Sequence, residues 1–219
     1  MAGIRDQYLE AMGIPVWVSR GQEQAELPGS ASPDVDWDQL QAAVRDCTLC
    51  GLHRRRTQTV FGVGSHDADL LIIGEAPGAE EDRRGEPFVG RAGQLLNAML
   101  GAIQLTRDEV YIANILKCQP PNNRDPKPEE AATCTPYLEG QMKLLRPRVI
   151  LALGRIAAQL LLQSDSPIGR LRGKEFSFGE EGTPLVASYH PAYLLRSPSA
   201  KTKAWEDLLL VRQILRIQS

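Results

Sequence analysis

Four short apolar runs set the strongest constraint on how this chain of 219 residues can fold. They are Asp69–Gly74, Val110–Leu116, Val149–Gly154 and Leu185–Tyr189. Each is short for a buried helix and apolar at nearly every position, as in a strand that is buried on both faces. The stretches between and after them have the spacing of amphipathic helices: Ala92–Ile103, Lys127–Leu145, Arg155–Leu162 and Thr202–Ile217. The pattern predicts an α/β fold, a three-layer α/β/α sandwich around a central four-stranded parallel sheet.

A polar stretch near the N-terminus divides the chain. Residues 20–36 are rich in Gln, Glu, Pro, Gly and Ser, which is the composition of a flexible linker. We therefore expect an N-terminal peptide at residues 1–19 and a folded, monomeric domain at residues 37–219. The chain has no apolar run of the length that a membrane span needs, and its N-terminus lacks the apolar core of a signal peptide. These features predict a cytoplasmic protein with no membrane association.

The charges are distributed unevenly. Residues 141–219 contain twice as many Lys and Arg residues as Asp and Glu residues, whereas the rest of the chain has an acidic excess. We therefore expect a polyanion to meet the C-terminal third first.

The ends of the predicted strands indicate where a ligand would bind. In parallel sheets, ligands bind beyond the carboxyl ends of the strands. That rule selects Glu75–Asp82, Lys117–Arg124, the turn after Gly154 and His190–Arg196. The sequence contains neither the GxGxxG pattern of dinucleotide sites nor the GKS/T pattern of phosphate loops, so nucleotide binding is not indicated.

The segment after the first strand forms a tight turn. Gly74, Glu75, Ala76 and Pro77 place backbone N–H groups and one carboxylate at the strand end. Glu75 is a candidate base or electrostatic stabiliser, whereas the acidic run Glu80–Asp82 is expected to be solvated or to begin a helix.

Three further residues at this edge have side chains suited to a ligand. Phe88 lies in a glycine-rich bend, where it belongs either to the core or to a stacking platform. Asn114 is an amide inside an apolar strand, so it must satisfy either backbone groups or a ligand. His190 follows the last strand and precedes a proline. This position favours a functional role over a structural one.

The loop after His190 combines apolar and basic side chains. Leu194 and Leu195 stand next to Arg196, an arrangement that suits insertion into a base stack together with a phosphate contact. The alternative is the first turn of a helix that packs on the core.

The complete set of cysteines is Cys47, Cys50, Cys118 and Cys134. The spacing of Cys47 and Cys50 lets two thiolates bind one metal centre, which Cys118 and Cys134 could complete from a second segment. Four sulfur ligands suit either Zn²⁺ or an iron–sulfur cluster. A redox-active pair and four unrelated buried thiols are the remaining alternatives.

Five motifs together resemble one enzyme family. CTLC, GEAPGAEED, PFVGRAGQLL, NILKCQPPNNRDPKPEE and HPAYLLR occur in the order found in the family 4 uracil-DNA glycosylases, from about Asp36 to the C-terminus. The resemblance implies excision of uracil from DNA by hydrolysis of the N-glycosidic bond, in base excision repair. It also implies a [4Fe–4S] cluster on the four cysteines.

The resemblance implies a role for each candidate residue. Phe88 would stack on the extruded uracil, and the Asn114 amide would donate to O4 and accept from N3–H. His190 would stabilise the uracil anion at O2, and Glu75 would orient the attacking water or stabilise the sugar cation. Leu194 and Leu195 would fill the gap that the extruded base leaves.

The N-terminal peptide resembles a different protein. Its pattern of Arg5, Tyr8, Leu9, Ile14 and Trp17 is similar to the N-terminal peptide of the psi subunit of the DNA polymerase III clamp-loader assembly. This similarity implies that residues 1–20 bind the clamp loader and tether the domain to DNA replication. Packing of this peptide on the protein's own domain is the alternative.

A second functional hypothesis follows from the N-terminal similarity. The chain could be a glycosylase-like replisome adaptor with weak or no catalysis. An adaptor needs no combination of Glu75, Phe88, Asn114 and His190, so their joint presence favours the enzyme.

Overall fold

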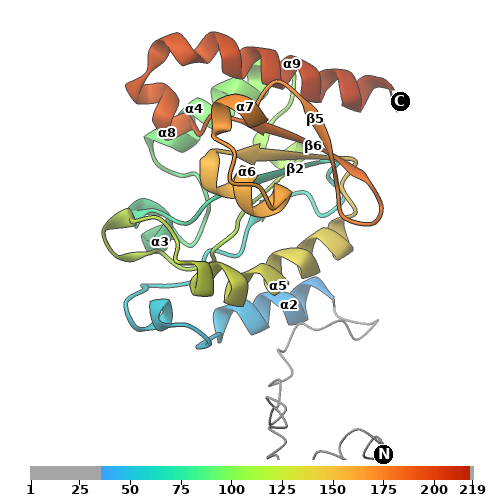
Figure 1. The fold of residues 1–219 in the computed structure, drawn as a ribbon. Coiled ribbons are helices and arrows are strands. Elements are labelled where there is room, and N and C mark those ends of the chain that lie inside the picture. The colour runs from blue at the N-terminus through green and yellow to red at the C-terminus, as the bar shows by residue number, and fades with distance from the viewer. Residues whose placement is uncertain (1–35, 218–219) are drawn as a thin grey trace, which may run out of the picture.

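The computed structural model describes residues 36–217 (Figure 1). Its strands are β1 (Val63–Gly64), β2 (Leu70–Gly74), β3 (Tyr111–Asn114), β4 (Val149–Leu153), β5 (Glu175–Phe178) and β6 (Thr183–Ser188). Its α-helices are α2 (Trp37–Arg45), α3 (Ala79–Arg84), α4 (Arg91–Ala102), α5 (Pro128–Leu145), α6 (Arg155–Leu162), α7 (Ile168–Leu171), α8 (Pro191–Arg196) and α9 (Lys201–Ile217). Four 3₁₀ turns lie at Gly51–Arg54, Arg107–Glu109, Pro121–Asn123 and Pro198–Ala200. Among the described helices, none is long and apolar enough to cross a membrane.

The strands form one sheet in the order β1-β3-β2-β4-β6-β5. The four central strands are parallel and correspond to the four apolar runs of the sequence, which confirms the predicted fold class. The predicted strand count was too low, because β1 and β5 add an antiparallel strand at each edge. Strand β1 has two residues, and β5 is half exposed, so neither has a continuous apolar run in the sequence.

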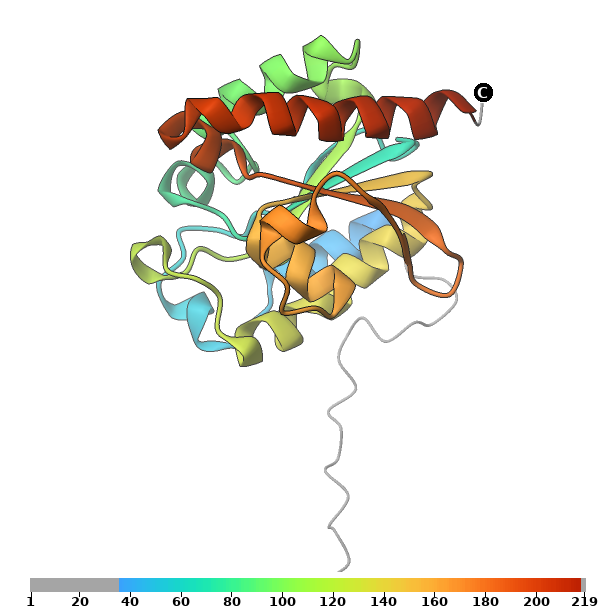
Figure 2. The same ribbon diagram turned by 45° about the horizontal axis from the view of Figure 1, so that its top comes forward.

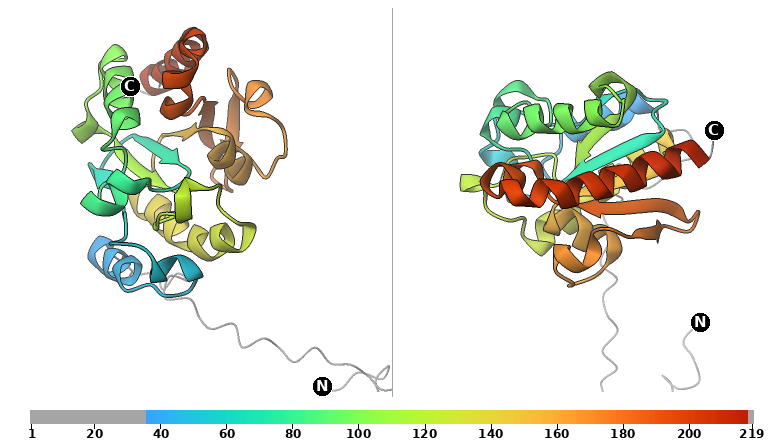
Figure 3. Two further views of the ribbon diagram at one scale, coloured as in Figure 1. Left: turned by 90° about the vertical axis from the view of Figure 1, so that its left-hand side faces the viewer. Right: turned by 90° about the horizontal axis from the view of Figure 1, so that it is seen from above.

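Helices cover both faces of the sheet in three layers. Alternate residues of each central strand point to opposite faces, so β4 sends Ile150 and Ala152 into one core cluster and Leu151 and Leu153 into the other. The first cluster contains residues of α5, α6 and α7, and the second contains residues of α4, α8 and α9. Figure 2 shows α9 crossing the sheet, and the right-hand view of Figure 3 shows α4 and α9 over the same face.

Helix α2 packs outside this sandwich. Its buried residues Leu40 and Val44 join Phe61 and Tyr137 in a third, smaller cluster against the outer side of α5. The helix begins after Asp36, whose carboxylate accepts the N–H group of Gln39 at 2.8 Å and caps the helix. The predicted peptide at residues 1–19 and all of the predicted linker except Asp36 lie outside the described residues.

Candidate active site

A pocket of about 460 Å³ opens at the edge of the sheet where β2, β3 and β6 end. Helices α3 and α8, which follow β2 and β6, mark this edge on the left of Figure 1, and it faces the viewer in the left-hand view of Figure 3. Three of the four predicted segments contribute to the pocket wall. Of the predicted residues, the wall contains Glu75, Ala76, Pro77, Phe88, Asn114, His190 and Arg196. This volume is typical of small-molecule sites.

Asn114 is the last residue of β3 and lies opposite Gly74 of β2. The residue is 2% exposed, and within the described part of the chain its side-chain amide makes no hydrogen bond to the protein. The amide opens onto the pocket, so its N–H and C=O groups are available to a ligand there. Gly74 is not on the pocket wall. Its contribution is space, because a Cβ atom there would lie 2.3 Å from Oδ1 of Asn114 and 2.8 Å from Cζ of Phe88.

Phe88 lies in the bend between α3 and α4, with a φ angle of 54°. Such a conformation costs a residue other than glycine about 1–3 kcal/mol, so the surroundings must hold it. The Glu81 carboxylate accepts the two backbone N–H groups that follow Phe88, at 3.0 and 3.2 Å. The Arg107 guanidinium donates to the Phe88 carbonyl and to the carbonyl before it. The Phe88 ring is stacked against His190, with ring centroids 5.5 Å apart and an interplanar angle of 27°.

Glu75 occupies the turn directly after β2 and is half-buried. Burial raises the pKa of its carboxyl group to about 7, and the negative charge of Asp125 adds to this rise. The positive charge of Arg155 opposes it, and Arg155 is paired with Asp125 at 2.6 Å. A carboxyl group with a pKa near neutrality is suited to accepting a proton during a reaction.

His190 is the N-cap of α8, and its Nδ1 atom accepts the N–H group of Ala192 at 3.1 Å. In the neutral ring the proton is therefore on Nε2. Burial lowers the pKa of His190 to about 4, and the positive charge of Arg196 acts in the same direction. The imidazole is therefore neutral at physiological pH, with one N–H group available as a hydrogen-bond donor.

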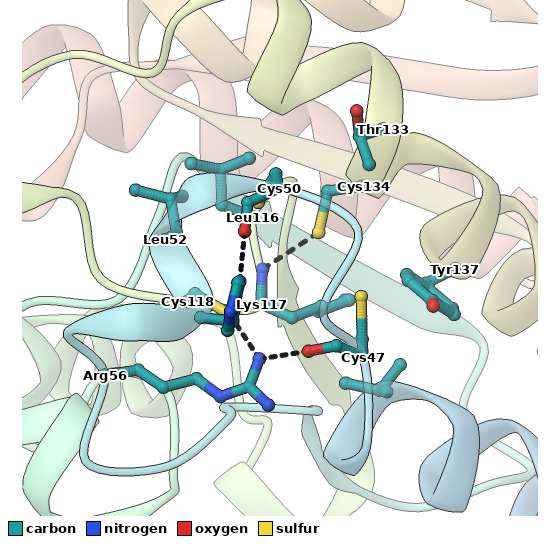
Figure 4. Close-up of a pocket in the computed structure, with 12 residues that line it drawn as sticks. Cys47, Cys50, Leu52, Arg56, Leu116, Lys117, Cys118, Thr133, Cys134 and Tyr137 are labelled. Atoms are coloured by element: carbon teal, nitrogen blue, oxygen red, sulfur yellow. Dashed lines mark hydrogen bonds between the residues drawn. The ribbon is translucent and has the colours of Figure 1, made fainter.

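The four cysteines line a second pocket, away from the first (Figure 4). Cys47 and Cys50 follow α2, Cys118 follows β3, and Cys134 lies on α5. All four are free thiols. Among the described residues, no group of three or more His, Cys, Asp or Glu side chains is arranged to hold a metal ion. The cysteines thus share one pocket without converging on a point.

Two residues donate hydrogen bonds to these sulfur atoms, Arg56 through its guanidinium and Lys117 through its backbone. Arg56 donates to Sγ of Cys118 at 3.3 Å and to the Cys47 carbonyl at 2.8 Å. The backbone N–H group of Lys117 donates to Sγ of Cys134 at 3.2 Å. Burial raises the pKa of the Cys134 thiol to about 12, and the charge of Lys117 opposes that rise. Positive neighbours favour the thiolate, which is the form that binds metals.

A family model described as the uracil DNA glycosylase superfamily matches residues 61–209. The matched region contains all six strands and every residue of the first pocket. The chain belongs to the uracil-DNA glycosylase superfamily.

Several relatives within this glycosylase superfamily have the same name. The type-4 uracil-DNA glycosylase of Archaeoglobus fulgidus is 42% identical and covers 81% of this chain and 92% of its own length. That of Pyrobaculum aerophilum is 40% identical and covers 80% of this chain and 93% of its own length. That of Thermotoga maritima is 43% identical and covers 71% of this chain and 81% of its own length.

Two carboxylates at the glycosylase site have roles that the sequence did not indicate. Glu81 holds the Phe88 bend, and Asp82 is buried, where its carboxylate accepts the N–H group of Thr57 at 2.9 Å. The acidic run begins α3, as expected, but only Glu80 has the solvated character that was predicted for the run. The glycines on both sides of Phe88 signalled a bend, yet no local pattern identified its partner.

The loop after β6 requires a correction. Leu194 was predicted to enter DNA with Leu195, but it is 1% exposed and belongs to the core under α4 and α9. It faces the core because α8 starts at Pro191 and turns this position inward. Leu195 is 38% exposed, and Tyr193 and Arg196 are exposed beside it.

Proposed function

We propose that the protein removes uracil from DNA by hydrolysing the bond between the base and the deoxyribose, which is the first step of base excision repair. The Asn114 amide supports this proposal most directly: it makes no hydrogen bond within the described part of the chain and lines a pocket large enough for a base, in a member of this superfamily. The relatives named type-4 uracil-DNA glycosylases support the same activity.

The target base must first leave the duplex, at a cost of a few kcal/mol. Phe88 supplies an aromatic face on which the extruded base stacks. The exposed side chain of Leu195 is the candidate wedge that fills the gap, and Arg196 is placed to contact a phosphate.

Asn114 distinguishes uracil from cytosine. Its NH₂ group donates to uracil O4 and its carbonyl oxygen accepts from N3–H. Cytosine has the opposite pattern at both positions, so it would leave buried groups unpaired, at about 1–3 kcal/mol each.

Bond cleavage leaves the electron pair of the N-glycosidic bond on the uracil ring, and the sugar gains oxocarbenium character. The neutral His190 donates its Nε2–H to O2 and so stabilises the developing anion. A water molecule attacks C1′ of the sugar, and the Glu75 carboxylate orients it and accepts its proton. The products are free uracil and an abasic site.

The cysteine pocket is the proposed site of a [4Fe–4S] cluster. The donor set fits, because four thiols share one pocket and two of the sulfur atoms accept hydrogen bonds, from the Arg56 guanidinium and the Lys117 backbone. Cys47, Cys50, Cys118 and Cys134 would hold the cluster. Its contribution when bound is structural, since it would join the segment after α2 to the segment after β3.

The activity is tested by uracil release from single-stranded and duplex oligonucleotides that contain uracil, with His190→Ala as the matched variant. We expect release by the wild-type protein and a loss of about 10²–10³-fold in the variant. Absence of release by folded, iron-loaded protein would refute the proposal.

The proposed clamp-loader contact concerns residues 1–20, which lie outside the described residues and outside the family match. Its support is the sequence pattern of that segment. Deleting residues 1–20 should abolish binding to the clamp loader and leave uracil release intact. If the full-length protein shows no binding, the contact does not exist.

A further inference from the structure

Lys117 is a buried cation that the proposed reaction does not use. The residue is 1% exposed, and its ammonium donates to the Asn114 carbonyl at 2.9 Å, to Oε1 of Gln141 at 2.6 Å and to the Phe61 carbonyl at 3.2 Å. Three acceptors require three N–H groups, which only the protonated ammonium has. No carboxylate of the described chain is paired with this charge.

The backbone of Lys117 contacts the cysteine pocket. Lys117 lines that pocket, and its backbone N–H group donates to Sγ of Cys134, as the dashed line in Figure 4 shows. Three acceptors, Phe61 O, Asn114 O and Gln141 Oε1, compensate the buried ammonium of Lys117. A buried charge persists only where an opposite charge or several hydrogen bonds compensate it.

The ammonium of Lys117 contacts a residue of the first pocket, which is called the base pocket below. Its bond to the Asn114 carbonyl fixes the backbone of the residue whose amide faces the pocket. Gln141, which accepts from the ammonium, also donates to the Phe61 carbonyl and to the hydroxyl of Tyr111 at the start of β3. One hydrogen-bond network therefore connects the end of β3 to the cysteines.

We propose that Lys117 is a positioning residue that couples the cysteine pocket to base recognition: its backbone N–H group is held by Cys134, and its ammonium fixes the backbone of Asn114. This inference rests on the proposed function and on the proposed cluster site. It predicts that a change at Lys117 alters both the cysteine centre and the selection of the base.

The test compares Lys117→Met, which removes the charge and keeps an unbranched side chain, with Gln141→Leu, which keeps the charge and removes one acceptor. Lys143→Met is the matched control, because Lys143 is exposed on α5 and takes no part in the network. Iron content, the reduction potential of the bound cluster, affinity for DNA, single-turnover uracil release and the uracil-to-cytosine rate ratio are measured for each.

For Lys117→Met we expect a more negative reduction potential, because a positive charge near an anionic centre is lost. We also expect uracil release to fall about 10- to 100-fold, with a smaller uracil-to-cytosine ratio and DNA affinity unchanged. Gln141→Leu should lower the rate and the ratio less, with iron retained. Lys143→Met should match the wild type.

Wild-type potential, rate and base selection in an iron-containing Lys117→Met protein would overturn the inference. If Lys117→Met loses iron, the uracil-to-cytosine rate ratio of Gln141→Leu decides the question. A smaller ratio supports the coupling, and a wild-type ratio overturns it. If the wild-type chain releases no uracil, the proposed function fails separately. The potential of Lys117→Met and the Asn114 side-chain amide resonance in both variants then decide whether the two sites are linked.

Discussion

At the scale of single residues, one physical cause gives two groups opposite properties. Burial raises the pKa of Glu75 to about 7 and lowers the pKa of His190 to about 4. Burial disfavours the charged form of each group. That form is the deprotonated carboxylate of Glu75 but the protonated imidazolium of His190, so the two pKa values shift in opposite directions. The pocket therefore combines a proton acceptor that titrates near neutrality with a neutral hydrogen-bond donor.

If Glu75 is the proposed proton acceptor, the rate of uracil release should rise with pH through about 7, as its carboxyl group ionises. Glu75→Gln should lower the rate about 10²–10⁴-fold and remove this rise. Single-turnover rates between about pH 5 and 9 measure both effects. A variant that keeps the same pH dependence would show that another group titrates.

Glu75→Gln should also change stability. The folded state holds the Glu75 proton more tightly than the unfolded chain, so the wild type loses stability as pH rises from its usual pKa to about 7. Above that range the variant should be more stable by about 1 kcal/mol, since partial exposure screens the effect. Denaturant unfolding at acidic and alkaline pH measures this. Equal stabilities at alkaline pH would contradict it.

Asn114→Asp should lower uracil release about 10- to 100-fold, because a carboxylate cannot donate to O4. The same change should increase release of cytosine, whose amino group can donate to the new carboxylate. Parallel rates on uracil and cytosine oligonucleotides measure both. Asn97→Asp, on the exposed side of α4, is the control. Unchanged rates on both bases would remove Asn114 from the reading of the base.

The sequence indicated several of these residues because the ends of strands are visible in it. His190 follows the last apolar run, where the strand-end rule expects a ligand. Asn114 was noticed as an amide inside the run Val110–Leu116, and it proves to be the last residue of β3. The partners of Glu81 and Asp82 and the burial of Leu194 were not predicted, because those partners are distant along the chain and that burial depends on how a short helix is turned. Such partners follow from packing and not from a local pattern.

At the scale of elements, the backbone of the Phe88 bend packs against helix α4. A Cβ atom at Gly93, in the first turn of α4, would lie 1.7 Å from the Phe88 carbonyl oxygen. The backbone of the bend therefore rests directly on the helix. At Gly101, in the last turn of the same helix, a Cβ atom would meet nothing within 4 Å.

Replacing these two glycines by alanine should have opposite effects. Alanine favours a helix by up to about 1 kcal/mol over glycine, so Gly101→Ala should raise stability slightly and leave uracil release unchanged. Gly93→Ala should lower both, because Phe88 must move. Thermal unfolding and single-turnover rates test the pair. If Gly93→Ala also raises stability with full activity, the bend does not depend on this contact.

The four central strands were predictable because both faces of each are buried, which demands apolar residues throughout. The edge strands escaped prediction for the converse reason. Strand β1 is defined by two backbone pairings to β3, and β5 has one exposed face and pairs only with β6.

At the scale of the whole molecule, the cysteine pocket lies between two packing units. Cys47 and Cys134 border the small cluster around α2, whereas Cys118 belongs to the main core below the sheet. A group bound by all four would therefore fasten α2 and its loop to the sandwich.

Protein purified without oxygen should absorb light at about 400 nm and contain iron and sulfide. Removal of the iron should lower the unfolding temperature, because ligand binding stabilises the folded state. Absorbance, metal analysis and thermal scans of loaded and stripped protein measure this. A colourless protein that contains stoichiometric zinc would contradict the cluster and indicate a zinc site.

The position of Trp37 makes it an intrinsic fluorescence probe of the cysteine centre. Its indole ring is stacked on His66 and packs against the cluster that Cys47 and Cys134 border, whereas Trp205 is exposed on α9 across the sheet. With Trp17 and Trp205 changed to phenylalanine, the remaining tryptophan fluorescence comes from Trp37, which packs against the same cluster as Cys47 and Cys134 and does not line the base pocket. An iron–sulfur cluster quenches tryptophan emission. Loss of iron should therefore increase the fluorescence intensity of Trp37, whereas uracil binding should leave it unchanged.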